Sequence, residues 1–164
     1  MTKTSRRLLA AALALATLGA LPGRDARAAE ISALVGSGSP GETWGSLWGG
    51  MLTISLFSIV HGEIEGAWQG GAFEGTSLYT ASAKAYLGPS IGRFVPYGGI
   101  GAGVYHQSQP VDDDQGTTGL VFVGAKLKFP MGLVLRAEYQ WLDLPDAAPV
   151  PLENRYFFAV GLSF

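Results

Sequence analysis

The feature that most constrains the fold is an alternation of apolar residues with small or polar ones, which continues from residue 29 to residue 164. Successive side chains of an extended chain point to opposite faces, so a period of two indicates β-strands. Clusters of Gly, Pro and Asp interrupt the alternation. The composition, with 24 Gly and only 15% charged residues, also favours strands and turns over helices. The strands predicted are 30–38, 46–56, 62–70, 77–88, 94–107, 118–129, 133–144 and 154–164.

The last predicted strand shows what the two faces are made of. One face is apolar throughout and carries Tyr156, Phe158, Val160, Leu162 and Phe164. The other carries small residues, a charge and one ring: Arg155, Phe157, Ala159, Gly161 and Ser163. This division is unusual for a soluble protein but expected where lipid lies outside a barrel and a packed polar lumen lies inside.

The connections between the eight predicted strands differ in length. Those after the first, third, fifth and seventh strands are longer and polar, and the others are short. An even number of strands with this asymmetry is typical of outer-membrane barrels, whose short turns face the periplasm. Each strand also has at least about the 9 to 11 residues that a tilted strand needs to cross a bilayer. We therefore predict an all-β fold, an eight-stranded antiparallel up-and-down transmembrane β-barrel, with both mature termini on the periplasmic side.

Aromatic residues near the strand ends agree with a membrane setting, because interfacial belts form where the barrel leaves the hydrocarbon. The alternative is a soluble barrel or sandwich whose apolar face is the core. In that case the opposite face should carry many Lys, Glu and Thr residues, whereas it holds mostly Gly, Ser and Ala. The aromatic residues assigned to the outer face are Trp48, Trp68, Tyr79, Phe94, Phe129, Trp141, Tyr156 and Phe164.

The first 28 residues have the pattern of a secretory signal peptide. Lys3, Arg6 and Arg7 precede an apolar run of 14 residues (8–21), and Ala26-Arg27-Ala28 gives a small-x-small cleavage site. The alternative, a retained helical anchor, is disfavoured because the run is shorter than the ~20 apolar residues that span a bilayer. We expect export through the Sec pathway and cleavage after Ala28, which leaves residues 29–164 as one barrel domain.

The charge and the cysteine content exclude several classes of function. Five of the 11 basic residues and one of the 13 acidic residues precede the cleavage site, so the exported chain has six bases, 12 acids and a net charge of −6. An acidic chain lacks the basic footprint of a nucleic-acid partner. There is no Cys for a disulfide or a thiolate metal site. We expect no cofactor and no metal.

The predicted inner face collects charges of both signs. An eight-stranded barrel is only wide enough for its interior to be filled by side chains, so these charges suggest a paired plug rather than an open pore. A gated ion path lined by the same charges is the alternative. Inward glycines of the fifth strand, such as Gly99, should make room for neighbouring rings. The predicted lumen charge network is Glu63, Glu65, Lys84, Lys126, Arg136, Glu138 and Arg155, with Lys128 also on the inward face.

The predicted outer rim is acidic throughout. The simplest interpretation is that these charges keep the loops solvated, although a rim of this sign would also attract divalent cations. Asp112 to Asp114 with Gly116 lack the alternating spacing of a calcium loop, so calcium binding is a weak hypothesis. The rim acids are Glu42, Glu74, Asp112, Asp113, Asp114, Asp143, Asp146 and Glu153.

Only one pair of residues suggests catalysis. His106 and Ser108 share a face at the end of the fifth strand and could act as a base and a nucleophile. Their spacing resembles the His-x-Ser of outer-membrane lipid A deacylases. The chain departs from that pattern because no Glu follows at comparable spacing to orient the His, which leaves only the loop of Asp112 to Asp114 as a source of an acid. The alternative is that both are polar residues of the rim.

Over residues 29–164 the chain resembles the small eight-stranded outer-membrane β-barrels of the OmpA/OmpX type, in the outer membrane protein β-barrel domain family. Its final strand is similar to their C-terminal assembly signal, carried here by Tyr156, Phe158, Val160, Leu162 and Phe164. The resemblance implies a monomeric, non-enzymatic protein of the bacterial outer membrane, inserted by the barrel-assembly machinery and surrounded by the bilayer and lipopolysaccharide. Its roles would range over envelope integrity, adhesion and host interaction. The alternatives are a lipid A-modifying enzyme using His106 and Ser108, and a narrow small-solute channel.

Overall fold

The computed structural model describes residues 29–39, 45–70, 77–108, 113–143 and 154–164. The predicted signal peptide and its cleavage site lie outside these residues. No helix in the described part of the chain is both long and apolar enough to cross a bilayer.

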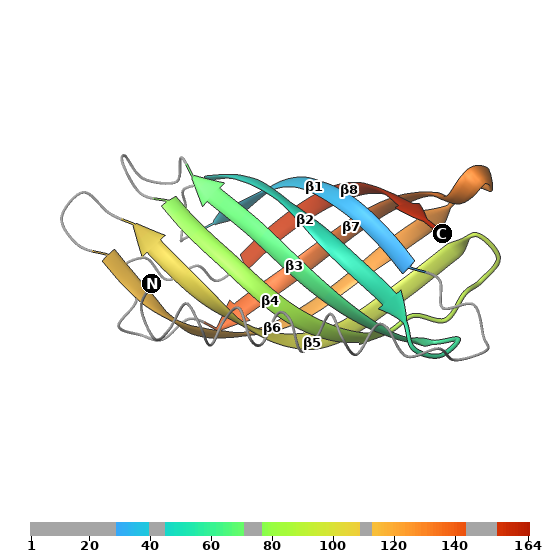
Figure 1. The fold of residues 1–164 in the computed structure, drawn as a ribbon, viewed down its shortest axis with the longest axis horizontal. Helices are drawn as coiled ribbons and strands as arrows, with labels where there is room; N and C mark the ends of the chain where they lie inside the picture. The colour runs from blue at the N-terminus through green and yellow to red at the C-terminus, as the bar shows by residue number, and fades with distance from the viewer. Residues whose placement is uncertain (1–28, 40–44, 71–76, 109–112, 144–153) are drawn as a thin grey trace.

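Eight antiparallel strands close into a barrel in which each strand pairs with its neighbours in sequence and β8 pairs with β1 (Figure 1). This is the predicted all-β, up-and-down architecture, and the prediction is confirmed. A closed barrel leaves no sheet edge with unpaired backbone groups, which is the condition for crossing hydrocarbon. The elements are β1 (Ala29–Ser39), β2 (Gly45–Ser55), β3 (Val60–Gly70), β4 (Ser77–Leu87), β5 (Phe94–Ser108), β6 (Asp113–Lys128), the 3-10 turn η1 (Pro130–Gly132), β7 (Leu133–Asp143) and β8 (Asn154–Ser163).

One predicted boundary is wrong. Seven strands begin and end within two residues of their predicted positions, but β6 begins at Asp113, five residues before its predicted start. The segment 113–117 was assigned to a polar loop, whereas it continues the ladder with β5 as far as the pair Ser108–Asp113. Tyr105 Oη donates to Asp114 Oδ2 at 2.8 Å and Ser108 Oγ to Asp113 Oδ1 at 2.9 Å. Cross-strand hydrogen bonds thus hold the segment 113–117 as a strand, although its composition alone is typical of a loop.

The alternating faces are divided as predicted. Outward apolar side chains are exposed, among them Ile100 at 66% and Phe158 at 63%, while the inward Phe122 and Gln140 have no exposed surface. All eight aromatic residues assigned to the outer face are exposed as well. A soluble barrel or sandwich would bury these apolar side chains, so that alternative fails. Lys128, also placed on the inner face, lines the same small cavity as Lys126 but is exposed, because it is the last residue of β6 and lies at the open end of the lumen.

The turn between β6 and β7 is tight, as expected from Pro130-Met131-Gly132. Met131 and Gly132 both have positive φ, at 64° and 79°. A Cβ on Gly132 would lie 2.4 Å from the carbonyl oxygen of Ser163 on β8. Glycine is therefore required here both for its backbone conformation and for the close approach to the neighbouring strand. This turn and the C-terminus lie at the same end of the barrel (Figure 1).

Candidate functional site

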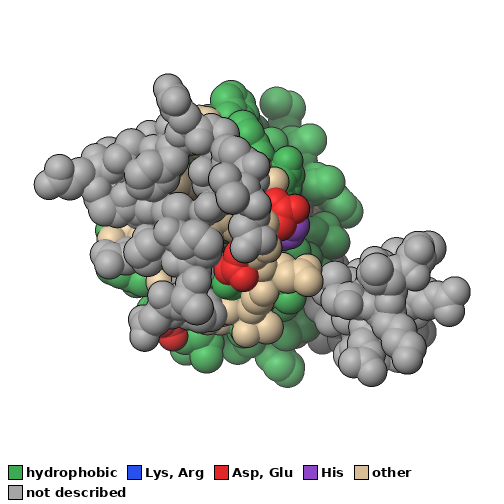
Figure 2. Space-filling model, turned by 90° about the vertical axis from the view of Figure 1, so that its left-hand side faces the viewer, with side chains coloured by type: hydrophobic (Ala, Val, Ile, Leu, Met, Phe, Trp, Pro, Cys, Tyr) green, Lys and Arg blue, Asp and Glu red, His purple; other side chains and the backbone are tan. Residues whose placement is uncertain are grey.

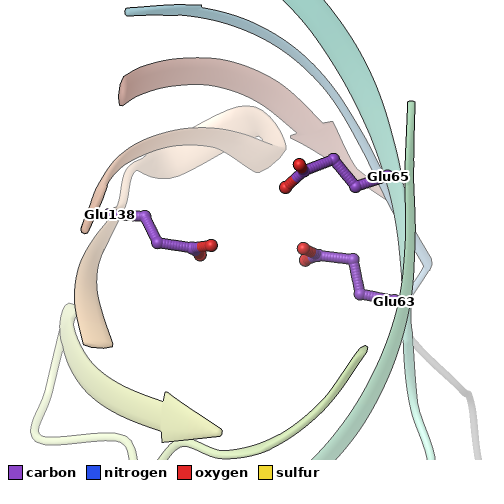
Figure 3. Close-up of side chains that lie close together, drawn as sticks. All are labelled: Glu63, Glu65 and Glu138. Carbon is purple, nitrogen blue, oxygen red and sulfur yellow. The ribbon is translucent and has the colours of Figure 1, made fainter. Parts of the chain in front are cut away.

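The centre of the lumen holds three carboxylates around one ammonium. Glu63 and Glu65 project from β3 and Glu138 projects toward them from β7 on the opposite wall (Figure 3). One oxygen of each lies within 4.8 Å of the other two. Lys84 Nζ lies 2.9 Å from Glu63 Oε1, 2.5 Å from Glu65 Oε2 and 2.8 Å from Glu138 Oε1. The place where a cation would bind is thus filled by the side chain of Lys84.

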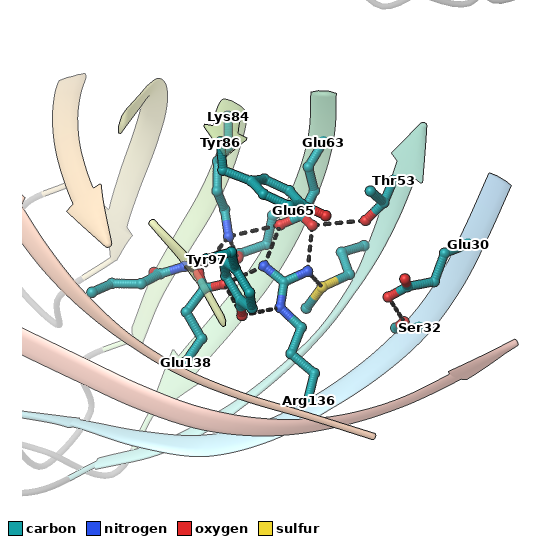
Figure 4. A network of polar contacts seen from close by, with 12 residues as sticks. Glu30, Ser32, Thr53, Glu63, Glu65, Lys84, Tyr86, Tyr97, Arg136 and Glu138 are labelled. Atoms are coloured by element: carbon teal, nitrogen blue, oxygen red, sulfur yellow. Dashed lines mark hydrogen bonds and ion pairs between the residues drawn. The ribbon is translucent and has the colours of Figure 1, made fainter. Parts of the chain in front are cut away.

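Arg136 joins the same carboxylates from β7 (Figure 4). Its guanidinium pairs with both Glu63 and Glu138, and its Nε donates to Tyr97 Oη at 2.6 Å. Tyr97 Oη in turn donates to Glu138 Oε2 at 2.8 Å. Thr53 Oγ1 completes the shell by donating to Glu63 Oε2 at 2.7 Å. A planar guanidinium can donate to several acceptors at once, which explains why Arg occupies the position with the most partners.

A second arginine extends the network toward β8. Arg155 pairs with Glu65 and donates through Nη1 to Thr80 Oγ1 at 2.9 Å and through Nε to Gln140 Oε1. The amide of Gln140 donates to Glu65 Oε2 at 2.9 Å and Glu138 Oε1 at 2.5 Å. Gln140 thereby links the two arginine sites.

Lys126 pairs with an acid that the sequence interpretation missed. Its Nζ lies 2.8 Å from Glu30 Oε2 and donates to Tyr86 Oη at the same distance. Glu30 is the second residue of β1, where Ile31 faces outward, so the alternation already placed Glu30 inside. With Glu30 included, four buried acids face four buried bases within the described part of the chain: Glu30, Glu63, Glu65 and Glu138 against Lys84, Lys126, Arg136 and Arg155.

Two properties of this network bear on its role: it contains equal numbers of buried acids and bases, and its charged atoms all have hydrogen-bond or ion-pair partners. Burying a charge costs several kcal/mol unless a partner and further hydrogen bonds compensate. Among the described residues, three buried side-chain atoms have no partner, and none belongs to a charged group: Gln69 Oε1, Ser82 Oγ and Gln107 Oε1. A cavity beside Lys126 and His61 has a volume of about 20 Å³, enough for about one water. The arrangement is therefore a side-chain plug that cross-links the barrel wall from inside.

Inward glycines let the large rings of the network fit. A Cβ on Gly124 would lie 2.3 Å from Tyr97 Oη, and one on Gly99 would lie 2.6 Å from Tyr86 Cβ. Both tyrosines are buried, and both hold a charged partner through the hydroxyl. The expectation that these glycines make room for rings is confirmed at Gly99.

The two catalytic candidates, His106 and Ser108, lie two residues apart near the end of β5. The exposed His106 has its ring 6.4 Å from that of Tyr79, and Ser108 Oγ donates to Asp113. No hydrogen bond joins His106 to Ser108 or to Asp114, in the ranges that the structure describes. Of the acids from Asp112 to Asp114 that could orient the imidazole, Asp114 accepts from Tyr105 and Asp113 accepts from Ser108, while Asp112 lies outside the described residues.

The acidic rim is only partly within the described residues. Asp113, Asp114 and Asp143 are described, and the view onto this end shows acidic side chains, with apolar ones along the visible part of the edge (Figure 2). The remaining acids assigned to the rim lie outside the described residues: Glu42, Glu74, Asp112, Asp146 and Glu153.

No protein-family model and no curated protein sequence matches the chain. Solved structures do. The N-terminal β-barrel domain of Pseudomonas aeruginosa OprF is 18% identical with a TM-score of 0.65, and the match covers 84% of this chain and 97% of that one. Neisserial surface protein A is 14% identical with a TM-score of 0.65, over 84% and 96%. The fold is that of the small outer-membrane β-barrels of the OmpA/OmpX type.

Two further solved structures match with lower TM-scores. Ail, the attachment invasion locus protein of Yersinia pestis, is 14% identical with a TM-score of 0.56, covering 84% of this chain and 98% of that one. The outer membrane enzyme PagL is 15% identical with a TM-score of 0.57, over 81% and 98%. Identities this low establish the fold alone. The surface completes the assignment, since a closed barrel with an apolar exterior and a charged interior is stable in a bilayer, and the chain is an outer-membrane protein.

Proposed function

We propose that this barrel is a non-enzymatic, monomeric outer-membrane protein with a structural or surface-interaction role, in envelope integrity, adhesion or host interaction. The observation that carries the proposal is the closed charge network of the lumen, in which every charged group has a partner inside the protein. Such a network holds the wall together, and each of its own charges is engaged by a partner within it. Biogenesis would use the barrel-assembly machinery, and lipopolysaccharide would surround the extracellular half.

The structural role has a direct test. Cells lacking the protein, cells complemented with it, and cells complemented with Arg136→Met are compared for survival in bile salts and for uptake of a large hydrophobic dye. We expect loss of the protein to lower survival in bile salts and to raise dye uptake. The wild-type chain should return both to their original levels. Unchanged survival and dye uptake in the deleted strain would exclude the envelope role and leave the surface-interaction role. That role is tested by measuring adherence of the same strains to host cells.

A lipid A-modifying activity is the second candidate, because His106 is exposed on the lipid-facing surface and one barrel of this fold is an outer membrane enzyme. Mass spectrometry of lipid A from cells with the protein, without it and with Ser108→Ala decides between the two. We expect the same acylation in all three. A loss of one acyl chain that depends on Ser108 would establish the enzyme and overturn our proposal.

A narrow solute channel is the third candidate. The charges of the plug could line an ion path only if they exchanged partners. Planar bilayers with the purified barrel should stay silent at moderate voltages, and stepwise currents that change in the Lys84→Met variant would overturn the non-conducting interpretation.

A further inference from the structure

One end of the barrel carries exposed apolar side chains that neither the charge network nor the proposed function explains. Three short connections lie at this end together with the C-terminus: 56–59 between β2 and β3, 88–93 between β4 and β5, and 129–132 between β6 and β7 (Figure 1). We call it the short-turn end, and in outer-membrane barrels it faces the periplasm. Turns in water favour small and polar residues. Each of these connections instead exposes a large apolar side chain, with exposed fractions of 72% at Phe57, 65% at Ile91 and 98% at Met131.

The backbone at Met131 makes this choice of residue harder to explain in water. Its φ of 64° lies in the left-handed region, and Gly132 after it also has positive φ. Asn, Asp and Gly adopt this conformation at the least cost, and they are the residues that tight turns prefer. Methionine has no such backbone advantage, and its side chain here is almost wholly outside the protein. The residue is explained if that side chain lies in an apolar medium.

The exposed aromatic side chains differ in kind between the two ends of the barrel. Those at the extracellular end are Trp and Tyr, whose polar groups favour the boundary between membrane and water. In the part of the chain that the structure describes, those at the short-turn end are all Phe, which has no polar group and gains more from hydrocarbon. The two sets are Trp48, Trp68, Tyr79, Trp141 and Tyr156 at the extracellular end, and Phe57, Phe94, Phe129 and Phe164 at the short-turn end.

The length of the strands gives an independent measure of depth. A strand tilted by about 40° advances about 2.6 Å along the barrel axis per residue, so an apolar band about 25 Å tall spans about ten residues. Counted along the chain from the interfacial Trp48 on β2, this distance ends at Ser58, next to Phe57. Counted back from Trp141 on β7, it ends at Met131. The hydrocarbon therefore reaches the turns, because the parts of β2 and β7 below these Trp residues are shorter than the band.

The charges at the short-turn end suit a layer of phosphates. The three connections contain no Asp or Glu, and their one charged residue is Arg93. Lys128, on the neighbouring strand, is also exposed, and its backbone N donates to the carbonyl oxygen of Arg93 at 2.9 Å. Basic side chains near a membrane surface are attracted to anionic headgroups. Their long stems can also lie in an apolar layer while the charged heads reach the phosphates.

We propose that the three short turns insert into the inner leaflet of the outer membrane and anchor the barrel there. Phe57, Ile91 and Met131 lie among the acyl chains, and the charged head of Arg93 reaches the phosphates. The occupant of this surface is the phospholipid leaflet itself, which presents a phosphate layer over an apolar one. A periplasmic protein could also cover apolar turns, but it would not account for the depth counted from Trp48 and Trp141. The inference goes beyond the proposed function and rests only on the membrane assignment.

The first test uses single-cysteine variants, for which the chain is suited because it contains no Cys. Nitroxide labels are attached to Phe57→Cys or Met131→Cys, and the barrel is folded into phospholipid vesicles. Electron paramagnetic resonance then measures collisions of each label with oxygen and with a water-soluble nickel chelate. Val123→Cys on the lipid-facing wall is the control for hydrocarbon, and Asp143→Cys at the extracellular end is the control for water.

We expect the two turn labels to lose most nickel collisions and to keep those with oxygen, as the label on Val123→Cys does. In vesicles with shorter acyl chains the apolar band is thinner, so nickel collisions at the turns should rise while those at Val123→Cys stay low.

The second test measures the unfolding equilibrium of Met131→Asn in urea, in the same vesicles. In water this change should stabilise the turn, because Asn adopts a positive φ more readily than Met. In the leaflet it should raise the unfolding constant about tenfold, because the loss of a buried apolar side chain outweighs the backbone gain. Met131→Leu keeps the apolar character and should stay close to the wild type. Ser58→Asn, a polar exchange in another of the turns, should also have little effect.

Two results would overturn the inference. One is a nickel collision rate at Phe57→Cys and Met131→Cys equal to that at Asp143→Cys. Protection of the same two positions in whole cells would then identify a periplasmic protein as the occupant. The other is a Met131→Asn variant that is as stable as the wild type or more stable, which would place the turn in water. Neither result bears on the envelope phenotype of the deleted strain, so the proposed function is tested separately.

Discussion

The inner and outer faces of the same strands follow different rules. On the outer face, residues such as Val123 and Leu135 contact a uniform hydrocarbon, so any apolar side chain serves. On the inner face, residues such as Arg136 and Gln140 each have two or more specific partners. Neighbouring residues of a strand therefore differ in what they require. The outer one needs only to be apolar, whereas the inner one must form particular hydrogen bonds and ion pairs. The outer face should therefore tolerate conservative change and the inner face should not.

The largest expected effect is on the inner face. Arg136→Met leaves Glu63 and Glu138 short of a buried partner, and truncating one side of such a pair costs about 3 to 5 kcal/mol. The measurement is the free energy of unfolding in urea with the barrel in lipid vesicles. Leu135→Met, one residue away on the outer face, should cost less than about 1.5 kcal/mol. Equal losses in the two variants would mean that the network does not stabilise the barrel.

The next effect tests the outer face. Val123→Arg should cost about 2 to 4 kcal/mol if the residue lies near the middle of the bilayer, because a charge there meets hydrocarbon. Val123→Leu, in the same unfolding measurement, should be nearly neutral. If arginine were tolerated at both Val123 and Leu135, hydrocarbon would not be the solvent of this face.

A smaller effect concerns the space inside. Gly124→Ala places a methyl group on Tyr97, and overpacking of this kind costs about 1 to 3 kcal/mol. Gly66→Ala is the control, since a Cβ there meets nothing within 4 Å. Displacement of Tyr97 should also change its fluorescence or its ring NMR signals. An unaffected Gly124→Ala variant would mean that the lumen is loosely packed.

The smallest expected effect is a difference in stability between a single and a double variant of one ion pair on the inner face. Lys126→Met should destabilise the barrel more than the double variant Lys126→Met with Glu30→Gln, because the double change leaves no unpaired charge. We expect a coupling energy of about 0.5 to 3 kcal/mol from the double-mutant cycle. Additive losses would show that the two side chains do not interact in the folded barrel.

Much of the fold could be predicted because a period of two needs no knowledge of distant residues. The alternation assigned Phe157 and Phe158 to opposite faces, and turn residues placed most strand ends within two positions. The start of β6 could not be predicted in this way. Asp113 to Thr117 look like a loop in isolation, and they form a strand because β5 offers Tyr105 and Ser108 as partners. The same limit applies to the exposure of Lys128, which faces inward as the alternation predicts but lies at the open end of the lumen.

By itself the sequence determined which side chains face lipid and which face the lumen, because the pleat of a strand fixes the direction of each residue from its neighbours. Only the tertiary structure decided which side chains contact each other in the lumen. Lys126 and Glu30 lie 96 residues apart and come together because the barrel closes through the pairing of β1 with β8. The position of Lys84 among three carboxylates likewise depends on the register of strands on opposite walls. Closure and register are properties of the whole sheet, and no single strand encodes them.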